Sequence, residues 1–373
     1  MKPLTLSASQ RSMFKQCQKK WWYAYMDNLE PVSERSAALW FGIGIHLAME
    51  KYYIPGTKRG TPPWETWAQY CADTRKEGLY ISVKGGNGEE DVYNSVDALK
   101  LGDAMLRHYV DFYGPEEHIE VISPELPFSV SVPHMEWQWN AAGDAVISRL
   151  EPFGFFRGVM DLTFRDLRDD TLWVKDYKTC SSLGYGRNQF LPLDDQAGAY
   201  YAIAEHYLHQ KGLIKQDEHL RGVIYDYLVK RAPDTRPRNQ DGLVCNKPLK
   251  ADYIAALAEN GQKGLDKLKL SELQSLAEQA GIEVFGKVSK NQPTPTLERV
   301  KVYRSKTQLK TQIQRIKSDM EAISLVRNGI VPASKNPTKD CAWCPFNELC
   351  ILDEDGRQDE KMKNLLYRIR EEH

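Results

Sequence analysis

The pattern of apolar and polar positions predicts a β-hairpin near the middle of the chain. Apolar residues alternate with small or polar ones from Phe156 to Phe164, and they do so again from Leu172 to Tyr177. The segment between them, Arg165 to Thr171, is rich in aspartate, which favours turns. A period of two places successive side chains on opposite faces of a strand. We therefore expect two antiparallel strands joined by a short turn.

The remaining pattern predicts helices around further strands. Apolar residues at helical spacing, with Ser7 as an N-cap, begin the chain. The expected helices are 7–28, 40–53, 92–113, 196–208, 251–286 and 305–328, and the expected strands are 119–132, 220–229 and 297–303, with 135–147 as a neighbouring strand and loop. In the last long helix the stripe expected to face the core is Leu309, Ile313, Ile316, Met320 and Ile323. Strands and crossover helices in this order predict an α/β fold with a mixed sheet.

Three of the charged side chains in and just after the predicted hairpin need an explanation. Asp161 lies within the first strand, where aspartate is depleted. Asp176 and Lys178 are two residues apart and so share one face of the second strand. Such a cluster is costly unless a cation or a phosphate joins it, and a divalent cation such as Mg²⁺ takes oxygen ligands. Taken alone, Asp-x-Lys also fits a solvated hairpin edge with a surface ion pair.

Three cysteines near the end of the chain predict a second metal site. They are spaced as Cys341-x-x-Cys344-x-x-x-x-x-Cys350, and His373 is the one histidine that follows them. Three thiolates need a fourth ligand to hold either zinc or a four-iron cluster. The other cysteines are Cys17, Cys71, Cys180 and Cys245. Spacing alone leaves four-cysteine zinc and iron–sulfur both open.

Composition and charge limit the class of protein. The 373 residues include 50 Lys and Arg against 51 Asp and Glu, for a net charge of −1. This balance gives no support to nucleic-acid binding, which would have to come from local basic groups. We see no apolar run of the length of a membrane span and no apolar core of a signal peptide. An odd number of cysteines, seven, argues against a disulfide framework, and we expect a cytoplasmic protein.

The hairpin and the helix after it together carry a recognisable series of motifs. These motifs are Gly158-x-x-Asp161, Asp176-x-Lys178 and Gln196-x-x-x-Tyr200. Their order and spacing resemble the PD-(D/E)XK nuclease superfamily. More narrowly, they resemble the RecB-like exonucleases, including CRISPR-associated and phage-encoded members that carry an iron–sulfur cluster. The resemblance implies one nuclease domain with a restriction-endonuclease-like core. Its expected parts are N-terminal helices (1–54), a helical insertion (55–114), the nuclease core (115–230), a second insertion (231–300) and a C-terminal cluster region (301–373).

The same resemblance implies roles for individual residues. Gly42-x-x-x-His46 matches the histidine motif of the family, which supplies a metal ligand. The implied ligands of Mg²⁺ or Mn²⁺ are His46, Asp161, Asp176 and the backbone carbonyl of Tyr177. The implied catalytic residues are Asp161, Asp176, Lys178, Gln196 and Tyr200. Glu125 is a further candidate because the family often has a glutamate in its first core strand; the alternative is an exposed glutamate between Pro124 and Pro127.

The resemblance also implies the nature of the cysteine site. In the family the fourth ligand comes from the first helix, at the position of Cys17, and the group is a 4Fe–4S cluster held by Cys17, Cys341, Cys344 and Cys350. Such a cluster would clamp the two ends of the chain together, so that metal binding stabilises the fold.

The implied function is a metal-dependent DNA exonuclease that hydrolyses phosphodiesters with an activated water. It would act in recombination, repair or phage DNA processing. The substrate would be single-stranded DNA or a duplex with an end, contacted through its backbone. The sequence has no P-loop, so unwinding would need a helicase; a recombinase or CRISPR integration partner and a homo-oligomer are also compatible. Two alternatives are a non-catalytic DNA-binding or recombination scaffold and a zinc-tailed interaction protein with a fortuitous Asp-x-Lys.

Overall fold

A computed structural model describes residues 4–32, 37–76, 95–139, 145–184, 187–356 and 360–370. The chain divides into two compact units. The larger consists of Met1–Lys230 and Leu297–His373, and the smaller is Arg231–Thr296. In the described part of the chain, no helix is long and apolar enough to cross a membrane.

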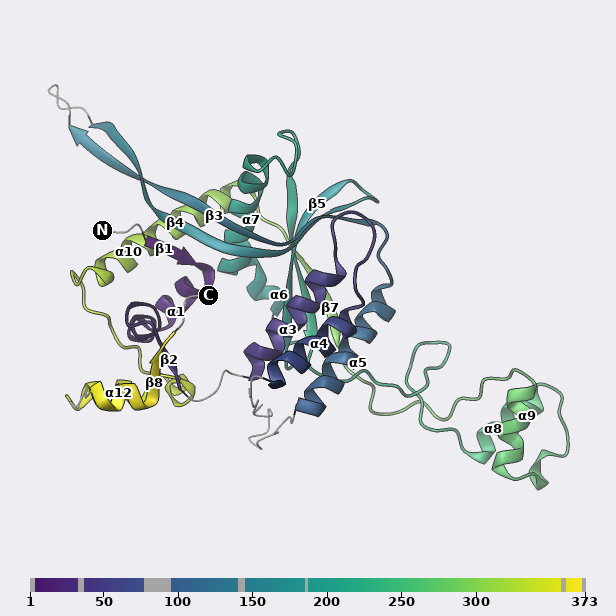
Figure 1. The fold of residues 1–373 in the computed structure, drawn as a ribbon. Coiled ribbons are helices and arrows are strands. Elements are labelled where there is room, and N and C mark those ends of the chain that lie inside the picture. The colour runs from purple at the N-terminus through teal and green to yellow at the C-terminus, as the bar shows by residue number, and fades with distance from the viewer. Residues whose placement is uncertain are drawn as a thin grey trace. The chain divides into compact units, whose positions relative to one another are not determined.

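A mixed six-stranded sheet forms the centre of the larger unit (Figure 1). The strand order is β1 (Leu4–Ser7), β4 (Ala145–Asp166), β5 (Thr171–Cys180), β6 (Leu220–Val229) and β7 (Leu297–Val302), and β3 (Ile119–Trp139) pairs with β4. The β1–β4 and β5–β6 pairs are parallel, whereas β3–β4, β4–β5 and β6–β7 are antiparallel. The predicted α/β class with a mixed central sheet is confirmed.

Strand β4 changes its partner along one edge. Residues 154–157 pair with β1, and residues 162–166 pair with β5 on the same edge, while β3 pairs along the other edge. Within the described sheet, positions 158–161 therefore have no ladder partner on the β1 and β5 side. This interval, which we call the β4 gap, contains Gly158 and Asp161.

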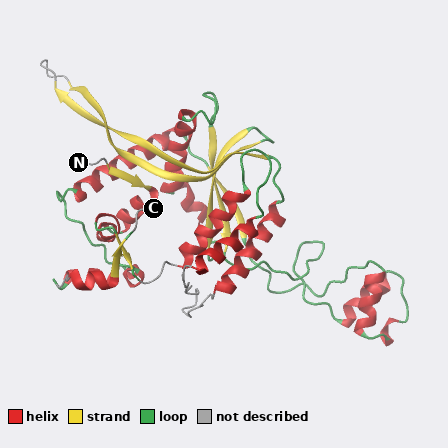
Figure 2. Cartoon of the chain, in the orientation of Figure 1, coloured by secondary structure: helices red, strands yellow, loops and turns green. Residues whose placement is uncertain are grey.

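Helices cover both faces of the sheet (Figure 2). On one face lie α1 (Ala8–Gln16), α7 (Asp195–Gln210) and α10 (Lys306–Arg327), whose apolar residues share a core with Phe156 and Val174. On the other face lie α3 (Ala37–Tyr52), α4 (Pro63–Lys76) and α5 (Ser95–Tyr113), which share a second core with Phe164 and Trp173. Each helix thus buries one apolar face against the sheet.

The predicted hairpin is confirmed as β4 and β5, and β6 has the predicted bounds. The expected end of the preceding strand at residue 132 is wrong. β3 continues to Trp139, where its backbone pairs with the beginning of β4. The described residues 135–139 and 145–147 are therefore not a separate strand and loop: they belong to β3 and β4, and the hydrogen bonds between these two strands keep the backbone extended.

Two expectations about helices also need correction. The N-terminal helix does not continue to residue 28: it stops at Cys17, whose backbone is extended, and α2 (Gln18–Trp21) with a π-helix, η1 (Trp22–Met26), follows. In α10, Ile313 is 46% exposed and Gln312 is buried instead. The cause is a polar contact, because the Gln312 amide donates to Asp195 at the start of α7.

The two ends of the chain pack together. Strands β2 (Leu29–Pro31) and β8 (Tyr367–Ile369) form a two-stranded antiparallel sheet. A small apolar core beneath it joins η1 to α11 (Asn347–Glu354), which follows a short 3₁₀ segment, η4 (Lys339–Trp343). A last helix, α12 (Glu360–Leu366), leads into β8.

The smaller unit is a helical pair with its own core. Helices α8 (Lys250–Glu259) and α9 (Leu270–Gln279) flank a 3₁₀ turn, η3 (Leu265–Lys267). Leu257, Leu265, Leu273 and Ala277 are buried between them. The expected helix over 251–286 is therefore two shorter helices, because Gly261 and Gly264 adopt the left-handed conformation that ends a helix.

Candidate functional site

The β4 gap brings Asp161 next to strand β5. The last β4–β5 pair before the gap is Leu162 with Lys175. Beyond this pair, the Tyr177 N–H, two residues after Lys175, donates to Asp161 Oδ2 at 2.8 Å. The carboxylate thus takes the place of a ladder acceptor. This explains why an aspartate is stable within a strand, where its side chain would otherwise leave a buried charge unsatisfied.

Strand β5 directs two charged side chains toward α7. Asp176 and Lys178 share the face that α7 covers, and Lys178 Nζ lies 2.7 Å from Asp176 Oδ2. Gln196, in the first turn of α7, donates to Asp176 Oδ1 at 3.0 Å and accepts from Lys178 Nζ at 3.0 Å. The three predicted residues therefore form one closed set of polar contacts.

A second group of ligand atoms lies across the β4 gap. One ligand atom from each of His46, Glu125 and Asp161 lies within 4.8 Å of the others. His46 Nδ1 is 3.3 Å from Asp161 Oδ2 and 3.8 Å from Glu125 Oε1, and its Nε2 is 3.0 Å from the Tyr177 carbonyl oxygen. Glu125 has a positive φ of 39°, uncommon for glutamate. The structure thus brings the candidate Glu125 to the predicted ligands His46, Asp161 and Tyr177.

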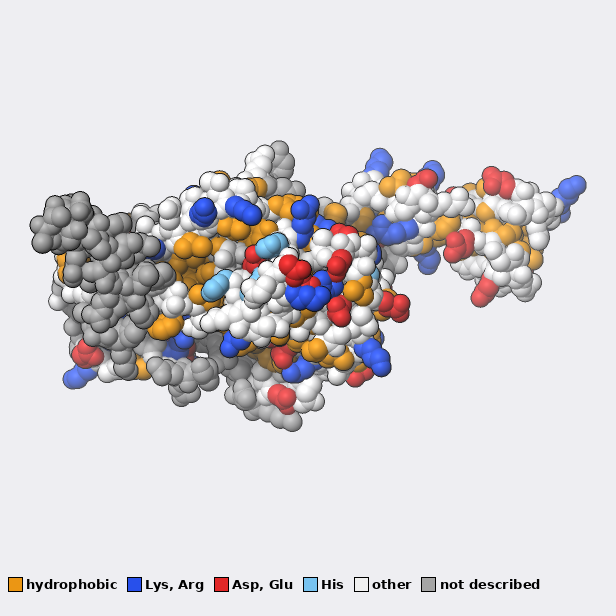
Figure 3. All heavy atoms as spheres, turned by 90° about the horizontal axis from the view of Figure 1, so that it is seen from above, with side chains coloured by type: hydrophobic (Ala, Val, Ile, Leu, Met, Phe, Trp, Pro, Cys, Tyr) orange, Lys and Arg blue, Asp and Glu red, His pale blue; other side chains and the backbone are white. Residues whose placement is uncertain are grey.

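The electrostatics of this group favour a cation at its centre. Although burial disfavours the charged imidazole, hydrogen bonds to Asp161 and Glu125 raise the pKa of His46 to about 10. Burial also raises the pKa of Asp176, although Lys178 opposes this. On the face drawn in Figure 3, acidic and basic side chains are interspersed, in keeping with the net charge of −1.

Tyr200 is largely buried. Only 8% of the residue is exposed, and its ring packs edge-to-face on Phe128 with centroids 5.7 Å apart. A hydrogen bond joins its phenol to Gln196, so Tyr200 contacts the predicted site residues from the buried side. Gly158 makes this packing possible, since a Cβ there would lie 2.7 Å from Phe128 and 3.3 Å from Tyr200.

Comparison with known proteins identifies the family. A family model described as the PD-(D/E)XK nuclease superfamily matches residues 5–351. The chain belongs to the PD-(D/E)XK nuclease superfamily. A crystal structure from Eubacterium rectale, named "Putative exonuclease", is similar over 91% of this chain and 87% of that chain, with 10% sequence identity and a TM-score of 0.41. A search of curated proteins gives no match.

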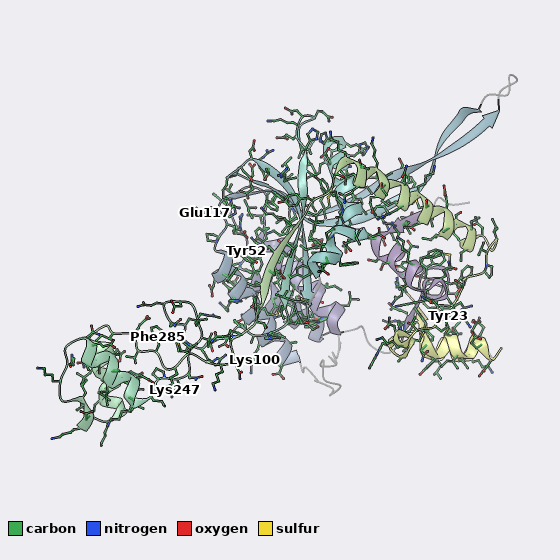
Figure 4. All side chains as sticks on the ribbon, turned by 180° about the vertical axis from the view of Figure 1, so that it is seen from behind. Tyr23, Tyr52, Lys100, Glu117, Lys247 and Phe285 are labelled. Atoms are coloured by element: carbon green, nitrogen blue, oxygen red, sulfur yellow. The ribbon has the colours of Figure 1, made fainter. Side chains whose placement is uncertain are left out.

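This PD-(D/E)XK protein also brings four cysteines around one cavity. Cys17, Cys341, Cys344 and Cys350 line a space of about 180 Å³, all unpaired and half-buried. Tyr23, labelled in Figure 4, lines it from the N-terminal side. Burial raises the pKa of Cys350, opposed by Lys335 and reinforced by Cys17 and Cys344. The cavity is thus formed where the first helix ends, at Cys17, and where this end meets the C-terminal cysteines.

Sequence reasoning missed a buried charge network behind the superfamily motif. Lys175, on the opposite face of β5 from Asp176, is fully buried with Asp226 and Glu116. Its Nζ lies 3.4 Å from Asp226 and 4.0 Å from Glu116, and Arg299 Nε donates to Asp226 at 2.8 Å. The available signal was a charged residue with apolar neighbours two positions away in each strand, Lys175 in β5 and Asp226 in β6, because such residues are seldom fully buried unless they are paired.

Proposed function

We propose that the protein is a metal-dependent DNA exonuclease of the RecB-like type. The observation that carries the proposal is the group of His46, Glu125 and Asp161 at the β4 gap, adjoining Asp176 and Lys178. A surface ion pair would not require side chains from four different elements, α3, β3, β4 and β5, to meet at one point. The donor set suits the hard cations that nucleases use, since it is mainly carboxylate and carbonyl oxygen.

The residues that would hold the cation are His46, Glu125, Asp161, Asp176 and the Tyr177 carbonyl. When bound, a divalent cation supplies Lewis acidity for a phosphodiester and lowers the pKa of a water molecule. His46 would exchange its contact with Tyr177 for this role, which requires the neutral imidazole. Asp161 would keep its position, because the Tyr177 N–H fixes its carboxylate.

Lys178 and Gln196 would act on the reacting phosphate. The Lys178 ammonium lies at the rim of the carboxylate group, one-third exposed, where it can stabilise negative charge that develops on phosphate oxygens. Burial disfavours its charge, but the Asp176 carboxylate more than compensates, and the pKa of Lys178 is raised. Lys178 therefore keeps its positive charge, and the Gln196 side-chain carbonyl orients its ammonium group. Tyr200 would position Gln196 through its phenol.

We further propose a 4Fe–4S cluster in the cysteine cavity, with a structural role. What supports a metal site here is that four thiols, from Cys17, Cys341, Cys344 and Cys350, line one cavity whose lining includes no histidine. Four thiolates suit both zinc and an iron–sulfur cluster. The resemblance to RecB-like nucleases favours the iron–sulfur cluster. The resemblance also implies a role in recombination, repair or phage DNA processing, with unwinding supplied by a helicase partner.

The decisive test is cleavage of end-labelled linear single-stranded and duplex DNA with Mg²⁺ or Mn²⁺, beside a covalently closed circle. We expect the wild type to shorten linear DNA and to spare the circle. Lys178→Ala and Asp161→Ala should be inactive, whereas Lys215→Ala, an exposed lysine outside the site, should match the wild type. A wild type that binds DNA but cuts neither form would favour the non-catalytic scaffold.

The cluster is tested by metal analysis of anaerobically purified protein. We expect iron and sulfide in equal amounts and visible absorbance, both lost in Cys17→Ser. Cys180→Ser is the matched control, because Cys180 is half-buried but outside the cavity lining. Stoichiometric zinc without iron would refute the cluster, and loss of iron in Cys180→Ser alone would refute Cys17 as the fourth ligand.

A further inference from the structure

A groove runs from the proposed active site along the first helix. One wall is α1, with Ser9, Ser12 and Lys15, and the other is the segment that leads into α7, with Phe190, Leu193 and Gln196. Its volume is about 500 Å³. Phe190 ends a short helix, α6 (Arg187–Phe190), and Leu193 ends a 3₁₀ turn, η2 (Leu191–Leu193).

The second wall exposes large apolar side chains. Phe190 is 60% exposed and Leu193 is 69% exposed, whereas Leu191 between them is buried. Leu191 therefore fixes the segment to the core while its neighbours project from it. Adjacent exposed apolar groups beside a polar site are typical of a surface that binds a partner.

The charges of the groove are already balanced within the protein. Asp195 is paired with Lys15 and accepts from Gln312. Asp194 caps α7 by accepting from the Ala197 N–H at 2.8 Å, and it also accepts from the Tyr225 hydroxyl. Both carboxylates thus have their own partners. The groove suits a ligand bound through apolar faces better than one bound through charge.

The groove is continuous with the proposed catalytic group through Gln196. This side chain lines the groove and also contacts Asp176 and Lys178. A DNA strand whose phosphate lies at the His46, Glu125 and Asp161 group would therefore have its neighbouring nucleotides beside the groove. Only unpaired bases expose their faces, and aromatic side chains bind such faces with little dependence on sequence.

We propose that this groove holds the bases of a single DNA strand, and that Phe190 stacks on one of them. The inference rests on the proposed function and deepens it, because it assigns an unpaired strand as the bound form of the substrate. Phe190 is a binding residue that sets substrate preference. It takes no part in the chemistry.

The test measures binding of fluorescein-labelled oligothymidylates and of a blunt duplex, in EDTA so that nothing is cut. We expect Phe190→Ala to weaken binding of the single strand by about 5- to 150-fold. The slope of log affinity against log salt should not change, since no phosphate contact is removed. Phe190→Trp should restore affinity, whereas Phe190→Leu should not. Phe112→Ala on α5 is the matched control, because Phe112 is 63% exposed and outside the groove.

Unchanged single-strand affinity in Phe190→Ala, equal weakening for the blunt duplex, or full affinity in Phe190→Leu would overturn the proposal. So would a loss of oligomers in Phe190→Ala, measured by sedimentation, since the groove would then be an interface between copies of the chain. Failure here is distinguishable from failure of the nuclease proposal. A wild type that cuts DNA while Phe190→Ala binds normally refutes only the groove, and a wild type that binds through Phe190 without cutting refutes only the chemistry.

Discussion

Replacing Glu116 with glutamine tests the charge network behind the site. The Glu116 side chain is only 2% exposed and accepts hydrogen bonds from Arg299 and Tyr53, with Lys175 4.0 Å away. The change keeps the shape of the side chain and removes its charge. It leaves Lys175 and Arg299 with Asp226 as their one remaining carboxylate among the described contacts.

The size of the effect follows from the pKa of Glu116. Burial raises this pKa, but Lys175 and Arg299 outweigh burial and lower it from 4.5 to about 2. A difference of about 2.5 pH units corresponds to roughly 3 kcal/mol. Because the folded pKa is depressed, this stability is present above about pH 4.5 and disappears as the pH falls toward 2. Linkage gives a loss of about 1 kcal/mol by pH 4 and about 2 kcal/mol by pH 3.

The assay is urea unfolding of the wild type and Glu116→Gln at pH 7, 5, 4 and 3. We expect the variant to be less stable at pH 7 by roughly 3–5 kcal/mol, since it leaves buried cations short of a partner. The deficit should shrink as the pH falls. The matched control is Glu117→Gln, because Glu117 is the exposed neighbour labelled in Figure 4. A deficit that is constant with pH, or equal in the two variants, would refute the reasoning.

Three further predictions concern the site and its support. Gln196→Leu removes hydrogen bonds to two charged groups and should slow DNA cleavage roughly 10- to 150-fold in single-turnover assays; an unchanged rate would exclude a positioning role. Gly102→Ala places a Cβ 2.2 Å from the Trp67 ring, so urea unfolding should show a loss of about 1–3 kcal/mol, whereas Gly184→Ala, in open space, should be neutral. Asp194→Ala removes the N-cap of α7 and should lower the free energy of unfolding by about 1–2 kcal/mol in the same measurement. A loss no larger than that of Gly184→Ala would argue against the cap.

Local sequence pattern was enough to predict the elements that carry the motif. Apolar and polar residues alternate in both 156–164 and 172–177, and this pattern was enough to predict the two paired strands of the hairpin. It also gave the shared face of Asp176 and Lys178, since that depends only on their spacing. The capping aspartate of α7 was predictable for the same reason: the Asp194 hydrogen bond is made within one helical turn.

Features set by distant parts of the chain were not predictable in this way. The stop at Cys17 interrupts a good helical pattern, and the C-terminal cysteines that share its cavity lie more than three hundred residues away in the sequence. The buried position of Gln312 reverses the polarity expected from its helix, because Asp195 on another helix supplies the partner. Periodicity records which side of a helix is apolar, but it carries no information about a polar partner elsewhere in the sequence.

The β4 gap explains how the same strand edge can pair with neighbouring strands of the sheet and also supply ligand groups to the site. A continuous β4–β5 ladder would use the Tyr177 N–H and carbonyl oxygen for backbone pairing and leave neither for a ligand. Because pairing stops at Leu162, the N–H is free to fix Asp161 and the carbonyl is free to face His46. The sheet therefore gives up a few backbone hydrogen bonds at the point where oxygen ligands gather. The charge network around Lys175, on the other face of the same strand, anchors β5 where that pairing ends.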